Sequence, residues 1–201
     1  FIRVHLMDGK PLILFVTSSM QYEGKTTLSG SIAIAVSEFQ KTLAMDCDFR
    51  NPSLHKFFGI DGGAGIIQIV SDESTTQEVV TRNSESLHLL SCGGAIAAPS
   101  KILHSERFSS LLDSLMEEYP VIIMDMPPVL LTPDVFAMNH PAAKGIMIVH
   151  GGSTRRHLFV KALKSLKVFN IDLIGVVMNK MPANSGPGHY SNYYFPYSEY
   201  S

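Results

Sequence analysis

The chain has 201 residues, of which 45% are hydrophobic and 17% are charged, and its formal net charge is −2. Because soluble domains usually carry about 25% charged residues, this composition indicates a well-buried core, and the length favours one domain over two. The near-neutral charge excludes a generally basic nucleic-acid-binding protein, so no nucleic acid is expected as a partner. Two cysteines are too few for a disulfide scaffold, and no apolar run approaches the roughly 20 residues that span a bilayer.

Short apolar runs alternate with helical patterns along the chain. The runs with the length and flanking turns of buried strands are Leu12–Val16, Thr42–Met45, Leu87–Leu90, Val121–Met124, Gly145–Val149 and Leu173–Met178. The helical segments are Thr26–Phe39, Glu106–Glu117 and Arg155–Phe169. This alternation predicts an α/β fold with a mostly parallel central sheet flanked by helices.

The C-terminal segment has a different composition. Residues 182–201 are rich in Pro, Gly, Ser and Asn and show no periodic pattern, so we predict a domain over residues 1–181 and a flexible tail over 182–201. Five of the seven tyrosines lie in this tail, at Tyr190, Tyr193, Tyr194, Tyr197 and Tyr200. An aromatic segment that docks on the core or on a partner is one interpretation. Because the tail offers few aliphatic side chains for packing, repeated phosphorylation is the favoured one.

A candidate phosphate-binding loop follows the first predicted strand. Gly24-Lys25-Thr26 is the second half of a Walker A motif and lies between a strand and a helix, as that motif requires. Gly24 would let backbone N–H groups approach phosphate oxygens, Lys25 would reach the β- and γ-phosphates, and the Thr26 hydroxyl would ligate Mg²⁺. Ser19 stands where the motif has its first glycine. The alternative is an ordinary strand-to-helix turn with an exposed lysine.

Three aspartates end predicted strands. Asp46 and Asp48 follow the second strand, and Asp125 ends an apolar run in the manner of a Walker B motif. Ligands of open parallel sheets bind at the carboxyl ends of the strands, where these carboxylates and Lys25 would meet. Carboxylates that converge repel each other unless a cation lies between them, which favours Mg²⁺ over the alternative of simple turn residues.

Taken in this order, the motifs resemble those of the bacterial protein-tyrosine kinases of polysaccharide biosynthesis, the BY-kinases. The matching segments are Glu23–Thr27, Met45–Pro52, Ile122–Pro128 and the tyrosine cluster of the tail. The resemblance implies a P-loop NTPase fold of the deviant Walker type, related to ATPases that position septa and partition chromosomes. It implies ATP and Mg²⁺ as cofactors, and transfer of the γ-phosphoryl group to tail tyrosines, usually those of a neighbouring subunit in a homo-oligomer.

The resemblance also assigns roles to individual residues. It implies that Asp46 is the carboxylate that activates the tyrosine hydroxyl, that Asp48 and Asp125 share in Mg²⁺ binding, and that Asn179 reads the adenine. The full set of expected site residues is Lys25, Asp46 and Asp48 for catalysis, Ser19, Glu23, Gly24, Lys25, Thr26, Thr27 and Asn179 for nucleotide binding, and Thr26, Asp48 and Asp125 for the metal.

The loop departs from the family in two places. Gln21-Tyr22 replaces the usual Pro-Gly, and because Tyr22 enters left-handed conformations less readily than glycine, we expect a somewhat different loop shape. Met20 stands where the septum-positioning relatives carry a signature lysine, which favours the kinase branch.

The resemblance also implies the partners, which are a neighbouring copy of the chain and a transmembrane polysaccharide co-polymerase or activator segment, with the chain in the cytoplasm at the inner face of the membrane. The main alternative function is a partition-type ATPase that acts as a nucleotide-switched scaffold, and a third is a catalytically weak regulatory domain. Arg155 and Arg156 are expected on a solvated helix face, with a docking surface for phosphate or a partner as the alternative. Asp134 is expected to cap a helix, and Cys47 to be buried.

Overall fold

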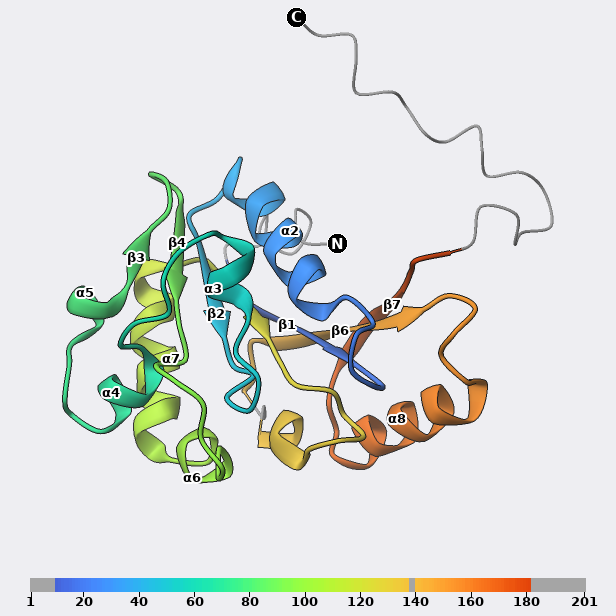
Figure 1. The fold of residues 1–201 in the computed structure, drawn as a ribbon. Coiled ribbons are helices and arrows are strands. Elements are labelled where there is room, and N and C mark those ends of the chain that lie inside the picture. The colour runs from blue at the N-terminus through green and yellow to red at the C-terminus, as the bar shows by residue number, and fades with distance from the viewer. Residues whose placement is uncertain (1–9, 138–139, 182–201) are drawn as a thin grey trace, which may run out of the picture.

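The computed structural model describes residues 10–137 and 140–181, which form a single seven-stranded sheet with helices on both faces (Figure 1). The strand order is β3-β4-β2-β5-β1-β6-β7, and each neighbouring pair is parallel except β3 and β4. The strands are β1 (Leu12–Ser18), β2 (Thr42–Asp46), β3 (Thr81–Arg82), β4 (Leu87–Leu90), β5 (Val121–Asp125), β6 (Ala143–His150) and β7 (Leu173–Asn179). The predicted mostly parallel α/β sheet is therefore confirmed.

The three long helices match the three predicted ones. They are α2 (Lys25–Ser37), α7 (Glu106–Glu118) and α8 (Arg156–Val168). The Ser105 side chain caps α7 by accepting a hydrogen bond from the backbone N–H of Phe108 at 3.1 Å. The remaining helices are α3 (Leu54–Phe57), α4 (Ile66–Val70), α5 (Thr76–Val79), α6 (Ser100–Leu103) and a 3₁₀ helix (Pro133–Ala137).

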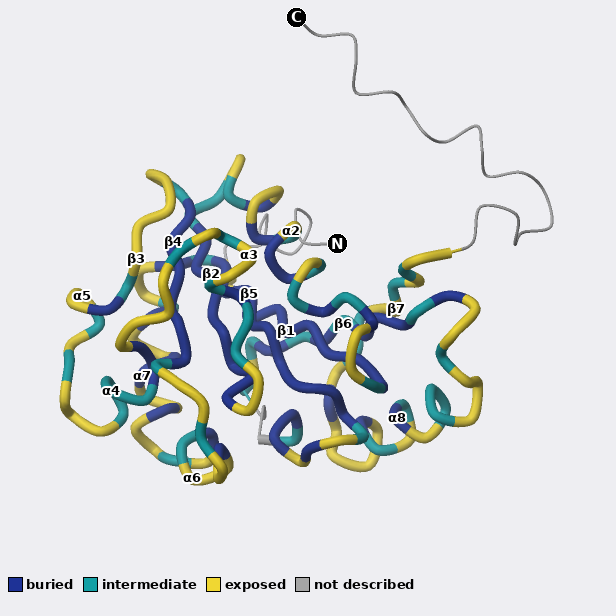
Figure 2. Tube along the Cα trace, viewed as in Figure 1, coloured by how far each residue is buried: buried dark blue, intermediate teal, exposed yellow. Residues whose placement is uncertain are grey.

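Alternate residues of the central strands point to opposite faces of the sheet, because side chains alternate along a strand. On one face Leu12 and Leu14 of β1 pack in a cluster with Ala33 and Val36 of α2. On the other face Ile13 and its neighbours pack with residues of α7 and α8. Central strands are buried on both faces, as the dark blue tube in Figure 2 shows, and this explains why they read as continuous apolar runs.

The edge strand β7 is less covered than the central strands. Val176 and Met178 are 43% and 61% exposed, although β7 pairs with β6 in parallel as expected. No helix in residues 10–137 and 140–181 is both long and apolar enough to cross a membrane.

The structure corrects one local prediction and bears out another. Asp134 does not cap a helix: it lies inside the 3₁₀ helix, and its buried carboxylate accepts a hydrogen bond from Nε of Arg50 at 2.9 Å. The hydroxyl that accepts from the backbone N–H of Asp134 belongs instead to Thr132, at 3.4 Å. The carboxylate is therefore used by a partner distant in sequence, which no local pattern reveals. Cys47 is buried, as expected.

Candidate active site

The candidate phosphate loop, residues 19–24, joins β1 to α2 at the carboxyl end of the sheet. Gly24 has φ 104°, a left-handed conformation, and a Cβ at this position would clash with Nδ2 of Asn179. Both observations require glycine, because any other residue would be strained and would displace Asn179. The Walker A glycine is thus explained by backbone geometry as well as by access to a phosphate.

Glu23 holds the loop together from inside. Its side chain is buried, and Oε2 accepts hydrogen bonds from the backbone N–H groups of Ser19 and Met20 at 2.8 and 3.2 Å. Its other oxygen accepts a hydrogen bond from the hydroxyl of Thr154, which lies between β6 and α8. Glu23 is therefore a supporting residue, since both of its oxygens are committed to the protein. The motif identified Glu23, but its partner Thr154 is 131 residues away and has no local signal.

Tyr22 lies at the tip of the loop with φ 63°, and its side chain is 82% exposed. The left-handed conformation that glycine adopts without strain is therefore imposed on a tyrosine. The carbonyl of Tyr22 accepts a hydrogen bond from Nζ of Lys180 at 3.0 Å, and the side chain of Asn179 donates to the carbonyl of Glu23 at 3.0 Å. The end of β7 is thus fastened to the loop.

We expect Tyr22→Gly to stabilise the fold by about 0.5–1 kcal/mol, because relief of the left-handed strain exceeds the added flexibility of glycine in the unfolded chain. Urea unfolding of both proteins measures the difference. Gln21→Gly is the matched control: Gln21 has no positive φ, so glycine there should lower stability. Equal effects of the two substitutions would remove the argument from strain.

A pair of carboxylates lies beneath the loop. Asp46 and Asp125 are paired in register on the adjacent strands β2 and β5, and both are fully buried. Asp125 accepts hydrogen bonds from the hydroxyls of Thr26 at 2.6 Å and Ser29 at 3.1 Å. The structure therefore brings together the Walker A threonine and the Walker B aspartate, as the motifs predict, and adds Ser29, which sequence reasoning missed.

Asp46 is held by backbone donors. Its Oδ2 accepts from the N–H groups of Ser53 and Leu54, each at 2.9 Å, and its Oδ1 accepts from the N–H of Asp48 at 3.2 Å. These bonds fix α3 and the segment after β2 against the sheet. Asp46 is thus engaged on both oxygens at the floor of the site, while its proposed catalytic role stays a prediction.

The pKa values of the buried pair are raised toward neutrality. Burial, with a further contribution from the charge of Asp125, raises the pKa of Asp46 to about 7. Burial raises the pKa of Asp125 to about 6, although the Thr26 hydroxyl and the charge of Lys25 act in the opposite direction. Ionisation of both adjacent carboxylates is therefore unfavourable, and a divalent cation nearby would lower their pKa values.

Asp48 is placed differently from Asp46. Its Oδ2 lies 4.0 Å from Nζ of Lys25, and both side chains are 9% exposed. Burial raises the pKa of Asp48, and Lys25 opposes that rise. A cleft of about 270 Å³ opens above these two residues. It is lined by Gln21, Tyr22, Gly24, Lys25, Thr26, Thr27, Asp48, Arg50, Asn51, Ser53, Pro127, Pro128, Leu131 and Thr132.

The predicted site residues thus fall into three groups. Gly24, Lys25, Thr26, Thr27 and Asp48 line the cleft. Asp46 and Asp125 are buried beneath it, and Ser19, Glu23 and Asn179 support the loop. The five tail tyrosines lie outside the described residues.

The residues present fit a nucleotide with Mg²⁺. Oγ of Ser19 is buried in the loop and has no hydrogen-bond partner within the described parts of the chain, so it is free to serve a bound group. The cleft wall offers Lys25, the Thr26 hydroxyl and one carboxylate, that of Asp48. Mg²⁺ usually takes one or two carboxylates and completes its shell with phosphate oxygens and water, so this donor set is suitable.

Comparisons with known proteins agree with this geometry. No family model matches the chain. The putative tyrosine-protein kinase CapB of Staphylococcus aureus is 26% identical over 188 residues, which are 92% of this chain and 81% of CapB. The tyrosine-protein kinase YwqD of Bacillus subtilis is 26% identical over 188 residues, which are 92% of this chain and 79% of YwqD. The kinase domain of VpsO has a TM-score of 0.83 at 28% identity, with 90% of each chain covered.

The chain is thus similar to bacterial tyrosine kinases over about nine tenths of its length. The BY-kinase resemblance drawn from the motifs is thereby confirmed. The septum site-determining protein MinD of Pyrococcus horikoshii, solved with Mg-ADP, has a TM-score of 0.69 at 18% identity and covers 84% of this chain and 70% of its own. At that identity the likeness shows the fold alone. It confirms the partition-ATPase type of P-loop fold for this chain and gives no support to a scaffold function.

Proposed function

We propose that the chain is an ATP- and Mg²⁺-dependent protein-tyrosine kinase that phosphorylates the tyrosine cluster of residues 190–200 and thereby regulates exopolysaccharide or capsule synthesis and export. The observation that carries the proposal is the cleft with Lys25, Thr26 and Asp48 on its wall above the buried carboxylate pair, in a chain similar to tyrosine kinases over nine tenths of its length. Phosphoryl transfer needs positioning and electrostatic stabilisation, and these groups supply both.

Each group has a proposed part in the reaction. Gly24 and the start of α2 present N–H groups to phosphate oxygens, and Lys25 neutralises the charge that develops on the transferred group. Thr26, Asp48 and Asp125 hold Mg²⁺, which supplies charge neutralisation between the phosphates when bound. Asn179 contacts the adenine in this proposal, supported by its position against Gly24.

Asp46 is the proposed proton acceptor. The tyrosine oxygen forms the new bond to phosphorus, the bond between phosphorus and the ADP oxygen breaks, and the hydroxyl proton passes to the carboxylate. Burial raises the pKa of Asp46, which favours proton uptake by this carboxylate. The three backbone N–H donors hold the carboxylate in place for this transfer.

Replacing all five tail tyrosines with phenylalanine tests the proposal. After incubation with ATP and Mg²⁺, mass spectrometry should find phosphotyrosine on residues 190–200 of the unaltered chain and none on the five-Phe variant. The matched control replaces three of the four tail serines, Ser191, Ser198 and Ser201, with alanine, and it should keep its phosphotyrosine. ATP hydrolysis without phosphotyrosine, with a membrane activator present, would favour the partition-type scaffold instead.

A mixing experiment tests whether the tail acts on a neighbouring subunit. A Lys25→Met chain keeps its tyrosines but lacks the lysine of the site, and the five-Phe chain keeps the site but lacks acceptors. If transfer occurs between subunits of a homo-oligomer, the mixture should carry phosphotyrosine on the Lys25→Met chain although neither protein is labelled alone. An unlabelled mixture of chains that still co-assemble would mean that each site acts on its own tail.

The cellular setting belongs to the same proposal. We place the chain at the cytoplasmic face of the membrane, with a transmembrane polysaccharide co-polymerase or activator segment as its partner. Five phosphates would add about −7 to −10 charge to the tail, and this charge would repel the carboxylates of the site. Phosphorylation therefore favours release of the tail and a change in the assembly.

A further inference from the structure

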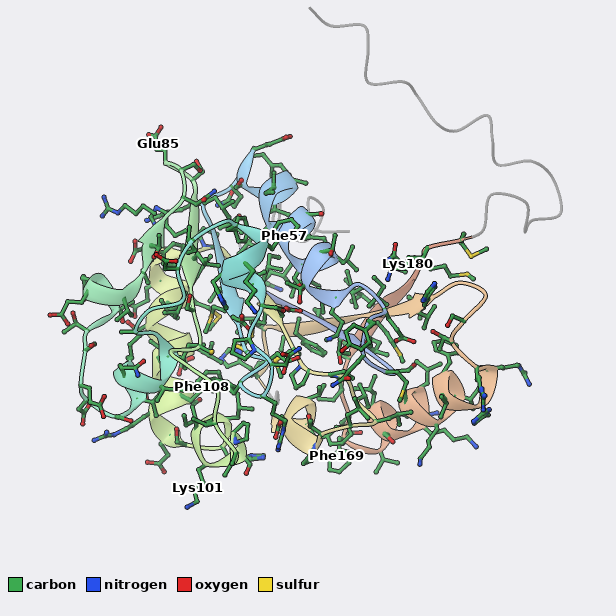
Figure 3. The ribbon with its side chains drawn as sticks, in the orientation of Figure 1. Phe57, Glu85, Lys101, Phe108, Phe169 and Lys180 are labelled. Carbon is green, nitrogen blue, oxygen red and sulfur yellow. The ribbon has the colours of Figure 1, made fainter. Side chains whose placement is uncertain are left out.

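One face of α8 is strongly basic. Six residues form this surface, which we call the α8 basic surface: Arg155, Arg156, His157, Lys161, Lys164 and Lys167. All six are exposed, and they include five of the 16 Lys and Arg residues of the chain. Within the described residues none of the six takes part in an ion pair, and no acidic residue occurs between Thr154 and Asp172. Figure 3 shows nitrogen-tipped side chains that project from α8 away from the sheet.

The charges at the start of α8 oppose the helix dipole. Arg155 is the N-cap residue, Arg156 and His157 follow it, and the first turn contains no acidic residue. Because the N-terminus of a helix carries partial positive charge, basic side chains there are unfavourable. These basic side chains therefore lower the stability of α8 at its N-terminus. Such departures from local preference are expected mainly at functional sites. An anion at this end of the helix would reverse the cost.

The α8 basic surface also contains a groove that is large enough for a ligand bigger than a single ion. Arg156, His157, Val160, Lys161 and Lys164 line a shallow groove of about 600 Å³. The lining combines the apolar Val160 side chain and the methylene stems of the lysines with their charged ends. A groove of this kind suits a ligand that combines an aromatic ring with a phosphate.

The described chain ends beside the start of the loop that leads from β6 to α8. The backbone N–H of Gly151, at the end of β6, donates to the carbonyl of Asn179 at 2.7 Å, and α8 begins five residues later at Arg156. Tyr190 is nine positions after Met181, so this tyrosine can lie up to about 30 Å from the end of the described chain. The 13-residue helix is about 20 Å long. A tail that turns back along α8 can therefore place its tyrosines over the basic residues.

We propose that the α8 basic surface binds the phosphorylated tyrosine cluster of the tail. The proposal rests on the proposed kinase function for the source of the phosphates. Its support is charge complementarity: a tail of about −7 to −10 when phosphorylated meets five unpaired Lys and Arg side chains and His157. Arginine binds phosphate through paired N–H donors, and clusters of arginine are a recurrent means of recognising phosphorylated segments. Phosphorylation thereby transfers the tail from the cleft to α8 and retains it there.

A synthetic peptide of residues 186–201 with five phosphotyrosines tests the surface without any need for catalysis. The receptor is the full chain with the five tyrosines replaced by phenylalanine, so that its own tail cannot compete. Fluorescence anisotropy at 150 mM salt should show binding that the triple variant Arg156→Gln, Lys161→Gln, Lys164→Gln weakens about tenfold, since three phosphate contacts are lost. The matched control is Lys10→Gln, Arg82→Gln, Lys101→Gln, which removes the same charge from exposed positions elsewhere and should change affinity less than twofold.

Three outcomes would overturn the proposal. Equal weakening in both triple variants would mean that the peptide responds to net charge alone. Equal binding of the unphosphorylated peptide would show that phosphate is not read. Binding of vesicles of phosphatidylglycerol and phosphatidylcholine that depends on the same three residues, without binding of the phosphopeptide, would assign the surface to an anionic membrane. If the phosphopeptide binds but the unaltered chain shows no kinase activity, the proposed function is refuted, while the proposal for the α8 basic surface still stands.

Discussion

Lys25→Met should lower the rate of tail phosphorylation by at least about 10²–10³-fold, because the variant lacks the positive charge that stabilises the transferred phosphoryl group. The fold should persist, since methionine keeps the length of the side chain and the ion pair that is lost, with Asp48, is long at 4.0 Å. Loss of Lys25 also removes a charge that lowers the pKa of Asp48 and of Asp125. The pKa of both carboxyl groups should therefore rise further.

The measurement is the initial rate of phosphotyrosine formation on residues 190–200, followed by mass spectrometry at saturating ATP and Mg²⁺. Lys101→Met is the matched control, because Lys101 is exposed on α6 (Figure 3) and lies outside the cleft. It should leave the rate unchanged. A rate for Lys25→Met within threefold of the unaltered chain would contradict the role assigned to this lysine and to the loop.

Asp125→Asn should stabilise the chain in the absence of nucleotide and Mg²⁺ by a few kcal/mol at pH 8, while it abolishes Mg²⁺-dependent activity. The pKa of Asp46 is raised to about 7 and that of Asp125 to about 6, so the fold prefers both carboxyls protonated. Stability from this preference is fully present below the ordinary pKa of 3.8 and is lost as the pH rises through about 6 and 7. Asparagine removes one charge of the pair, and the hydroxyls of Thr26 and Ser29 can turn to bond with it.

Chemical unfolding of both proteins between pH 4 and pH 8 measures this effect as a difference between them. The free energy of unfolding of Asp125→Asn should exceed that of the unaltered chain by almost nothing at pH 4, and this difference should reach its full size by pH 8. Asp61→Asn, at an exposed position, should show no such dependence. Addition of Mg²⁺ with ADP should stabilise the unaltered chain and not the variant. A difference that stays constant with pH would contradict the repulsion between Asp46 and Asp125.

The sequence predicts the features of this protein that arise from local pattern. The central strands are buried on both faces, so each reads as an apolar run, and the long helices α7 and α8 bury one spaced row of apolar residues. The four helices of four or five residues, α3 to α6, were not predicted, because one turn is too short to show a period. The short antiparallel strand β3, with two exposed residues, gives no apolar pattern either.

The candidate site likewise contains residues that the sequence predicts and contacts that it does not. Lys25, Thr26 and Asp125 were predictable because each occurs at a fixed place after a strand or in a motif. The contacts that position them were not predictable, because they join residues distant in the chain, such as Thr154 to Glu23. The burial of Asp46 was also missed: two aspartates two residues apart suggest equal access, yet one contacts backbone donors beneath the cleft and the other lies on its wall.

The attachment of β7 to the phosphate loop has a kinetic consequence. Lys180 and Asn179 bond to two carbonyls of the loop, so the point from which the tail departs is fixed relative to the cleft of the same chain. Short flexible tethers supply a reacting group at an effective concentration of about a millimolar. If the tail is the substrate, as proposed, its five tyrosines would be presented at about that concentration within an assembly of copies, whatever the protein concentration. Such delivery would remove the need for tight recognition of the residues around each tyrosine, which agrees with their differing neighbours.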